Sequence, residues 1–237
     1  MLASSRKDIT PGESRDEVNA FLAKVAATPA PVRGSQQGRL MFAMDATASR
    51  GPSWDQACQI QAQMFDATAS LGGLDVQLCY FRGFREFRAS TWVADARRLA
   101  RLMSSVRCAG GITQIGRTLE HALVEARKAP VNAVVFIGDC MEEDVDVLCA
   151  RAGELGLLGV PVFMFHEGRD AAAERCFREI CRLTRGAYSR FDAASAEHLR
   201  ELLTAVAVYA AGGRKALEDL GSRRGGVIRQ LSQDLDS

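Results

Sequence analysis

Short apolar runs alternate with longer amphipathic segments along most of this 237-residue chain. The runs have the length of buried strands, and the segments between them have the length and spacing of helices. Strands that alternate with helices predict a mostly parallel sheet with helices on both of its faces. A chain of this length suffices for one such domain with modest extensions. We therefore expect an α/β fold built on one main sheet.

Most of the predicted strands are apolar, and one charged strand is expected at the sheet edge. The strand predictions are residues 39–44, 74–80, 84–88, 133–138, 160–165 and 187–191. Residues 84–88 carry charges and follow Gly83, so we expect them to form a partner strand at the sheet edge, next to residues 74–80.

The helices expected between these strands begin and end at recognisable residues. The helix predictions are residues 53–70, 93–105, 115–128, 143–156, 170–184 and 195–210. Three acids, Glu142, Glu143 and Asp144, come at the start of the helix predicted over 143–156. Acidic side chains suit a helix N-terminus, so we expect all three in its first turn.

Residues 37–212 are predicted to be the main domain, with an extension on each side. Residues 14–27 have helical spacing of apolar side chains, and prolines and glycines break the chain after them. We therefore expect a separate helical arm and linker over residues 1–36. Residues 213–237 mix charged side chains with glycines, so a flexible tail is expected there.

Composition excludes several classes of partner. The net charge is +1, which gives no reason to expect nucleic acid or a membrane surface as a partner. No apolar run is long enough to span a membrane, and residues 1–33 lack the apolar core of a secretory signal. The seven cysteines show no metal-ligand spacing and are expected to be reduced thiols. These features predict a cytoplasmic protein.

Side chains with hard oxygen atoms stand at three points where the chain leaves a strand or enters a loop. Asp45, Thr47 and Ser49 follow the first apolar run, Thr113 follows a glycine pair, and Asp139 ends another run. Loops at the carboxyl edge of a parallel sheet converge where α/β proteins bind ligands. Hard oxygen ligands suit Mg²⁺ or Mn²⁺. We therefore predict a metal site made by these five residues.

The three-part pattern resembles a von Willebrand factor type A (VWA) domain with a metal-ion-dependent adhesion site, of the intracellular bacterial type. The segments that carry the resemblance are residues 45–49 (DATAS), 110–113 (GGIT) and 137–139 (IGD). It extends over about residues 37–212 and implies a Rossmann-like, doubly wound, mostly parallel sheet with one antiparallel edge strand. Residues 66–70 repeat the first motif inside a predicted helix with no strand before it, so we assign this copy no role.

The resemblance implies a role for each predicted ligand. Thr47 and Ser49 bind the metal directly, while Asp45 binds it directly or through water and orients the first loop. Thr113 changes its contact with the state of the ligand, and Asp139 acts through water. The implied cation is Mg²⁺ or Mn²⁺, with Ca²⁺ as a further candidate.

The chain departs from the family pattern at two positions. Thr47 stands where serine is commoner, which keeps the hydroxyl and adds a methyl group. Cys140 follows Asp139 where glycine or serine is usual, so it bears on the shape of the third loop and on access to the metal.

The charges of the predicted site favour binding over catalysis. Two acids and three neutral hydroxyls leave a divalent cation undersatisfied, so it attracts a carboxylate from another molecule. The histidines, His121, His166 and His198, are expected away from the motifs, which leaves no general base. We therefore predict a binding module, not an enzyme, that captures an Asp or Glu of a protein partner. The resemblance implies AAA+ ATPases as one class of partner.

Two alternatives are a metal-dependent phosphohydrolase and a metal-free scaffold with a vestigial site. Phosphatases of the haloacid dehalogenase type need Asp-x-Asp after the first strand, and Thr47 occupies the second position here. Oxygen-bearing side chains at all five positions argue against the scaffold.

Overall fold

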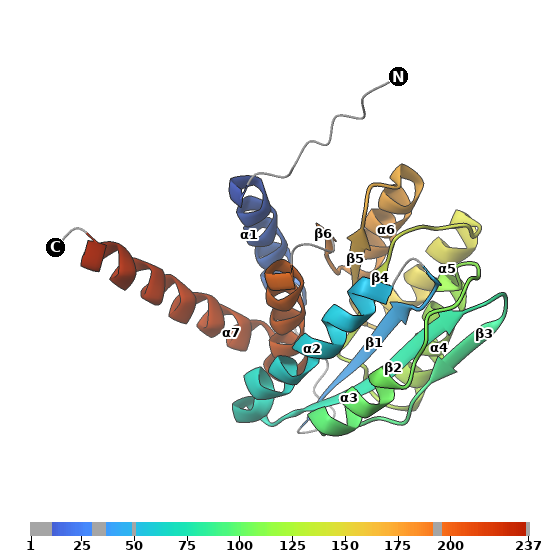
Figure 1. The fold of residues 1–237 in the computed structure, drawn as a ribbon, viewed down its shortest axis with the longest axis horizontal. Coiled ribbons are helices and arrows are strands. Elements are labelled where there is room, and N and C mark those ends of the chain that lie inside the picture. The colour runs from blue at the N-terminus through green and yellow to red at the C-terminus, as the bar shows by residue number, and fades with distance from the viewer. Residues whose placement is uncertain (1–10, 30–36, 49–50, 192–195, 236–237) are drawn as a thin grey trace, which may run out of the picture.

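The computed structural model describes residues 11–29, 37–48, 51–191 and 196–235, and within them six strands form one sheet (Figure 1). The sheet order is β3-β2-β1-β4-β5-β6. The strands are β1 (Gly38–Asp45), β2 (Leu74–Arg82), β3 (Glu86–Ala89), β4 (Ala133–Gly138), β5 (Val162–Glu167) and β6 (Tyr188–Phe191). All neighbouring strands are parallel except β2 and β3, which are antiparallel. The predicted fold class, with its antiparallel edge strand, is confirmed.

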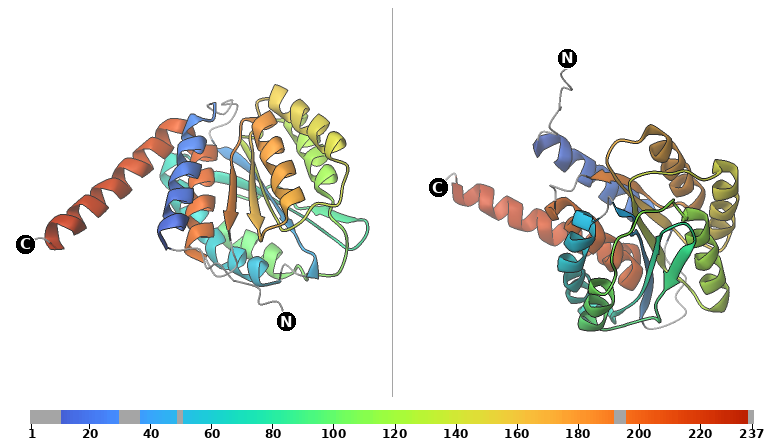
Figure 2. Two further views of the ribbon diagram at one scale, coloured as in Figure 1. Left: turned by 90° about the horizontal axis from the view of Figure 1, so that it is seen from above. Right: turned by 45° about the vertical axis from the view of Figure 1, so that its right-hand side comes forward.

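Helices cover both faces of the sheet (Figure 2). The helices are α1 (Pro11–Ala27), α2 (Gly51–Thr68), α3 (Ala96–Ser104), α4 (Ile115–Lys128), α5 (Val145–Leu157), α6 (Ala171–Thr184) and α7 (Ala196–Leu235). Helices α4, α5 and α6 cover one face, and α1, α2, α3 and α7 cover the other. None of these helices, within the described residues, has the length and apolar character needed to cross a bilayer.

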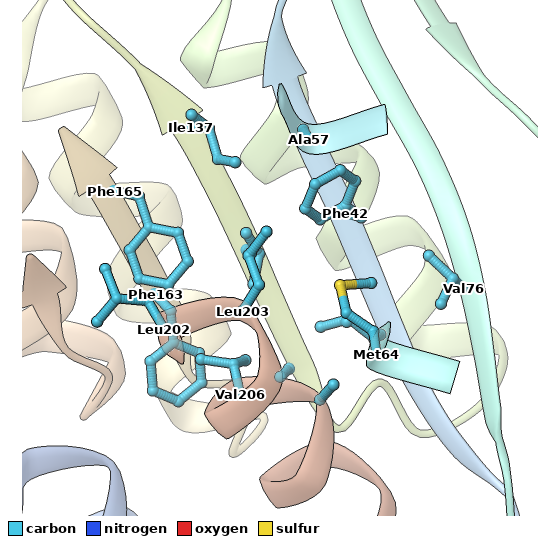
Figure 3. Packing of buried hydrophobic residues seen from close by; sticks show 14 of the residues in the cluster. Phe42, Ala57, Met64, Val76, Ile137, Phe163, Phe165, Leu202, Leu203 and Val206 are labelled. Carbon is cyan, nitrogen blue, oxygen red and sulfur yellow. The ribbon is translucent and has the colours of Figure 1, made fainter. Parts of the chain in front are cut away.

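The central strands are apolar throughout because both of their faces are buried. In β1, Phe42 points into the core under α2 and α7, while Met41 points into the core under α4, α5 and α6. Figure 3 shows Phe42 of β1, Ile137 of β4 and Phe165 of β5 in a row across this face of the sheet, with Leu203 of α7 packed against the same face. Strands buried in this way read as continuous apolar runs, which is the pattern seen in the sequence.

Helix α1 packs on the main domain and does not stand apart as the arm expected from the sequence. Its Phe21 is 2% exposed, and Val25 is fully buried. The ring of Phe21 contacts Phe163 and Phe165 of β5, with centroid distances of 6.3 and 5.4 Å. The helix runs beside the first half of α7 (Figure 2). Its apolar stripe therefore belongs to the core of the domain.

The expected flexible tail is helical in the structure as far as Leu235. Helix α7 is interrupted at Gly213, whose φ of 69° and ψ of −165° lie outside the helical range. Beyond this glycine, Leu217 is 5% exposed and joins the core near α1. The remainder of α7 extends away from the domain (Figure 1).

Candidate metal centre

The candidate site lies at the point where the connections of the sheet change direction. From β1 the chain proceeds to β2 on one side, and the later strands continue from β4 on the other side. In open α/β sheets, the crevice at such a switch point lies beyond the carboxyl ends of the strands. Asp45 is the last residue of β1, and Asp139 directly follows β4. The two acids therefore flank this crevice.

The structure brings Asp45 and Asp139 into direct proximity. One carboxylate oxygen from each acid and the thiol sulfur of Cys140 lie within 4.8 Å of one another. Asp45 is 1% exposed, and its Oδ2 and the Oδ1 of Asp139 are both shielded from solvent. Two carboxylates this close repel each other when poorly hydrated. The oxygen ligands of one Mg²⁺ lie no more than about 4.2 Å apart, so carboxylate oxygens within 4.8 Å of each other are compatible with such a cation, and oxygen is the donor that it prefers.

The first loop is held by the residues around it. Oδ1 of Asp45 accepts a hydrogen bond of 2.7 Å from the backbone N–H of Thr47. The N–H of Ala46 donates to the carbonyl of Phe81 at the end of β2, and the carbonyl of Ala46 accepts from Ala109. The first loop is thus fixed to β2 and to the second loop. Thr47 is 9% exposed beside Asp45, and Ser49 lies outside the described residues.

Thr113 is joined to the third loop by a reciprocal pair of hydrogen bonds. Its backbone N–H donates to Oε2 of Glu142, and its Oγ1 accepts from the backbone N–H of Glu142, both at 3.1 Å. Glu142 lies three residues after Asp139, so this pair brings Thr113 to the same loop as Asp139. Thr113 is 3% exposed.

Glu142 and Glu143 do not occupy the first turn of α5, so the sequence expectation for them is wrong. Helix α5 begins at Val145, and Asp144 is its N-cap. Glu143 instead accepts hydrogen bonds from Ile115 N at 2.5 Å and Gly116 N at 2.9 Å, and so caps α4. The sequence pattern assigned these acids to α5 because it is the next helix along the chain. In the structure, the N-terminus of the earlier helix α4 lies within hydrogen-bonding distance of Glu143.

Cys140 contributes a thiol to the same cluster. Its side chain is half-buried and hydrogen-bonds to the carboxylate of Asp139. Burial, with the nearby charge of Asp139, raises the pKa of the Cys140 thiol to about 12. A protonated thiol is a neutral, soft group and a poor ligand for Mg²⁺. The oxygen atoms of the two acids are therefore the better donors.

His166 lies beside the third loop, which corrects the expectation that no histidine is near the motifs. Its ring is fully buried in β5, with Nε2 3.2 Å from the carbonyl oxygen of Asp139 and Nδ1 2.9 Å from the hydroxyl of Tyr188. The parallel register pairs Gly138 with His166, which explains why a distant residue comes next to Asp139. Burial lowers the pKa of His166 and favours the neutral ring. Both ring nitrogens have hydrogen-bonding partners inside the protein, so the role of His166 here is to hold the third loop in place at Asp139.

The second copy of the DATAS motif lies far from this site. Asp66 is exposed near the end of α2, and Ser70 is exposed in the 3₁₀ turn η2 (Ala69–Leu71). Gly72 and Gly73, with φ of 102° and 90°, then lead into the start of β2. The motif copy is therefore at the amino edge of β2, opposite the edge that carries Asp45. Its placement on a helix agrees with the sequence analysis.

No protein-family model matches this chain, and no curated protein matches it. Solved structures do match. A von Willebrand factor type A protein from Catenulispora acidiphila superposes with a TM-score of 0.57 at 18% identity, over 73% of this chain and 43% of that one. The SpRpn10 VWA domain superposes with a TM-score of 0.54 at 13% identity, over 75% of this chain and 97% of the domain.

A third match is the pilus adhesin SpaC from Lactobacillus rhamnosus GG, in its open conformation. Its TM-score is 0.58 at 10% identity, over 81% of this chain and 31% of the adhesin. This chain thus matches less than half the length of SpaC and of the C. acidiphila protein. At these identities the similarity concerns the fold, and the chain has the fold of a von Willebrand factor type A domain.

Proposed function

We propose that this chain is a protein-interaction module that captures an acidic side chain of a protein partner through a divalent cation. The observation that carries this proposal is the pair Asp45 and Asp139, with an oxygen from each within 4.8 Å at the switch point of the sheet. The cation would be Mg²⁺ or Mn²⁺, with Ca²⁺ as a further candidate. Its proposed ligands are Asp45, Thr47, Ser49, Thr113 and Asp139.

The charge of this ligand set supports capture of an acid. Asp45 and Asp139 carry the formal charges, and the remaining proposed ligands are neutral hydroxyls. The bound cation would supply a hard, positively charged coordination position for a further carboxylate. A partner that donates Asp or Glu satisfies this position, so binding of the metal and binding of the partner should strengthen each other.

The surrounding residues prepare the site for this role. Glu142 ties Thr113 to the third loop, and Glu143 fixes the start of α4 behind it. His166 supports the carbonyl of Asp139 from the neighbouring strand. Loops braced in this way lose little conformational entropy when a ligand binds, which favours affinity.

The fold also supports a binding role. The solved structures of similar fold include a pilus adhesin and the human COPII-coat protein Sec24c, the latter with a TM-score of 0.51 at 10% identity over 75% of this chain. The resemblance to intracellular bacterial VWA proteins makes an AAA+ ATPase one class of partner to test first. We place the protein in the cytoplasm in the same proposal.

A capture experiment tests the proposal. The full chain, immobilised and loaded with Mg²⁺, should retain a protein from extracts of its source cell that is released by EDTA. The Asp139→Ala variant should not retain it, whereas the Asp66→Ala control should. A protein retained equally with Mg²⁺ and with EDTA would contradict the role of the metal.

A second measurement separates the binding module from the phosphohydrolase. We expect the Mg²⁺-loaded chain to show no turnover of phosphoester substrates, because His166 is buried and Thr47 stands where a second acid is needed. Turnover by the native chain that disappears in Asp45→Ala would favour the hydrolase.

A further inference from the structure

We propose that the captured acid is flanked by an apolar side chain, which packs on Phe84 and Ile112 beside the metal centre. The partner is thus a peptide segment in which Asp or Glu stands next to a residue such as leucine. This inference rests on the proposed function and specifies the partner that the same site takes.

Phe84 and Ile112 are brought together by backbone contact between two loops. The N–H of Ile112 donates to the carbonyl of Gly83 in the β2–β3 turn, at 3.2 Å. A Cβ atom at Gly111 would lie 2.2 Å from the same carbonyl oxygen, so the close approach requires glycine there. Phe84 follows Gly83, and Ile112 precedes Thr113. The two apolar residues therefore belong to loops that touch, and Ile112 is the neighbour in sequence of the proposed metal ligand Thr113.

Both side chains are exposed to solvent. Phe84 is 76% exposed and Ile112 is 43% exposed. A single exposed apolar residue needs no explanation, but neighbouring ones at the rim of a polar site are typical of a contact surface. Aromatic residues in particular provide a large contact area at a small cost in side-chain entropy.

The hairpin that carries Phe84 is braced, so this side chain is presented on a fixed support. Arg82 makes two hydrogen bonds to the carboxylate of Glu86 across the turn, at 2.9 and 3.1 Å. The side-chain amide of Gln114 donates to the carbonyls of Arg82 and Glu86, each at 3.4 Å. Arg117 of α4 donates to the carbonyl of Arg85 at 2.6 Å. The turn is thereby tied to the start of α4, which directly follows the second loop.

Charge decides on which side of the site the partner lies. Arg85 and Arg117, both exposed, stand on the hairpin side of Thr113. Beyond β4, on the other side of β1 from the hairpin, the exposed acids Asp144 and Asp146 stand at the start of α5. An acidic segment is attracted to the first side and repelled by the second. The apolar neighbour of the captured acid is therefore directed to Phe84 and Ile112.

Helix α5 supplies a matched control for this choice. Val147 is 46% exposed, close to the 43% of Ile112, but it stands next to Asp146 on the acidic side. If any exposed apolar residue near the site served equally, Val147 would contribute as much as Ile112. In our proposal it contributes nothing.

The test uses two synthetic peptides, Ac-Gly-Leu-Asp-Leu-Gly-NH₂ and Ac-Gly-Ser-Asp-Ser-Gly-NH₂, with leucine or serine on both sides of the acid. Binding to the ¹⁵N-labelled full chain in Mg²⁺ is followed by amide chemical shifts, which detect weak complexes. The leucine peptide should bind about tenfold more tightly than the serine peptide, a difference typical of small apolar contacts. Phe84→Ser should remove this preference by weakening the leucine peptide to about the affinity of the serine peptide, and Val147→Ser should preserve the preference.

The outcomes separate this inference from the proposed function. Equal, Mg²⁺-dependent binding of both peptides would overturn the inference and leave the metal-dependent module standing. A preference that survives Phe84→Ser but is lost in Val147→Ser would place the apolar contact on α5, and would also overturn it. Failure of both peptides to bind in Mg²⁺, with metal binding intact by calorimetry, would overturn the inference and the capture of acids together.

Discussion

Thr113 and Glu142 exchange two hydrogen bonds of 3.1 Å, in which the backbone N–H of each residue donates to a side-chain oxygen of the other. They come from different loops, separated by all of α4 and β4. This pair therefore couples the second loop to the loop that contains Asp139. A group that orients a ligand without touching the metal commonly changes metal affinity when it is removed.

Substitution of Glu142 tests this coupling. Glu142→Ala removes the acceptor for the N–H of Thr113, so we expect Mg²⁺ affinity to fall by about tenfold. Glu142→Gln keeps an amide oxygen at that position and should retain most of the affinity. Isothermal titration calorimetry compares the three chains. Equal affinity in all of them would show that the coupling does not position Thr113.

Cys140→Ser is expected to leave Mg²⁺ binding within about threefold of the native value, because a protonated thiol is a poor ligand for a hard cation. Asp139→Asn, one residue away, should abolish binding in the same titration. A loss in Cys140→Ser as large as that in Asp139→Asn would make the sulfur itself a ligand.

Phe21→Ala should lower the free energy of unfolding by about 3–5 kcal/mol, because it removes a buried aromatic ring from the shared core of α1 and β5. Urea denaturation measures this change. Leu157→Ala, at a side chain that is 90% exposed, is the control and should have little effect. A similarly small effect of Phe21→Ala would show that α1 is dispensable for the fold.

The pH dependence of stability should change when His121 is replaced. Burial lowers the pKa of His121 below its usual 6.5, partly offset by the nearby charge of Glu125. The unfolded chain then binds a proton more readily than the folded chain. This contribution to stability is fully present above about pH 6.5 and is lost as the pH falls below it.

His121→Gln removes that titration and keeps a hydrogen-bonding group near Gln77, which lies 3.0 Å from Nε2 of the native ring. Urea midpoints at pH 7.5 and 5.5 should therefore differ less in the variant than in the native chain. An identical pH dependence in both would exclude His121 as a contributor.

Much of the fold can be predicted from the sequence. Helices cover both faces of the sheet, so its central strands are apolar throughout and stand out as apolar runs. The apolar run at 133–138 and the amphipathic segment at 115–128 match β4 and α4 to the residue. Helix α3 begins at Ala96 rather than residue 93, because Val93 pairs with Val76 and Asp95 forms the N-cap. Such pairing depends on a distant partner, which local patterns do not reveal.

Part of the candidate site can likewise be predicted from the sequence, and part of it cannot. The meeting of Asp45 and Asp139 follows from parallel strands whose carboxyl ends share an edge. The contacts of Glu142, Glu143 and His166 depend on which helix and which strand lie alongside, so the sequence pattern did not identify them. The parallel register of β4 and β5, once known, points directly to His166.

The central claim is that a divalent cation binds between Asp45 and Asp139. Calorimetric titration of Mn²⁺ and Mg²⁺ into the native chain, Asp45→Ala and Asp66→Ala tests it most directly, because the last two variants change the same residue in two copies of one motif. We predict saturable binding in the native chain and in Asp66→Ala, and none in folded Asp45→Ala. Equal binding by Asp45→Ala and the native chain would contradict the claim.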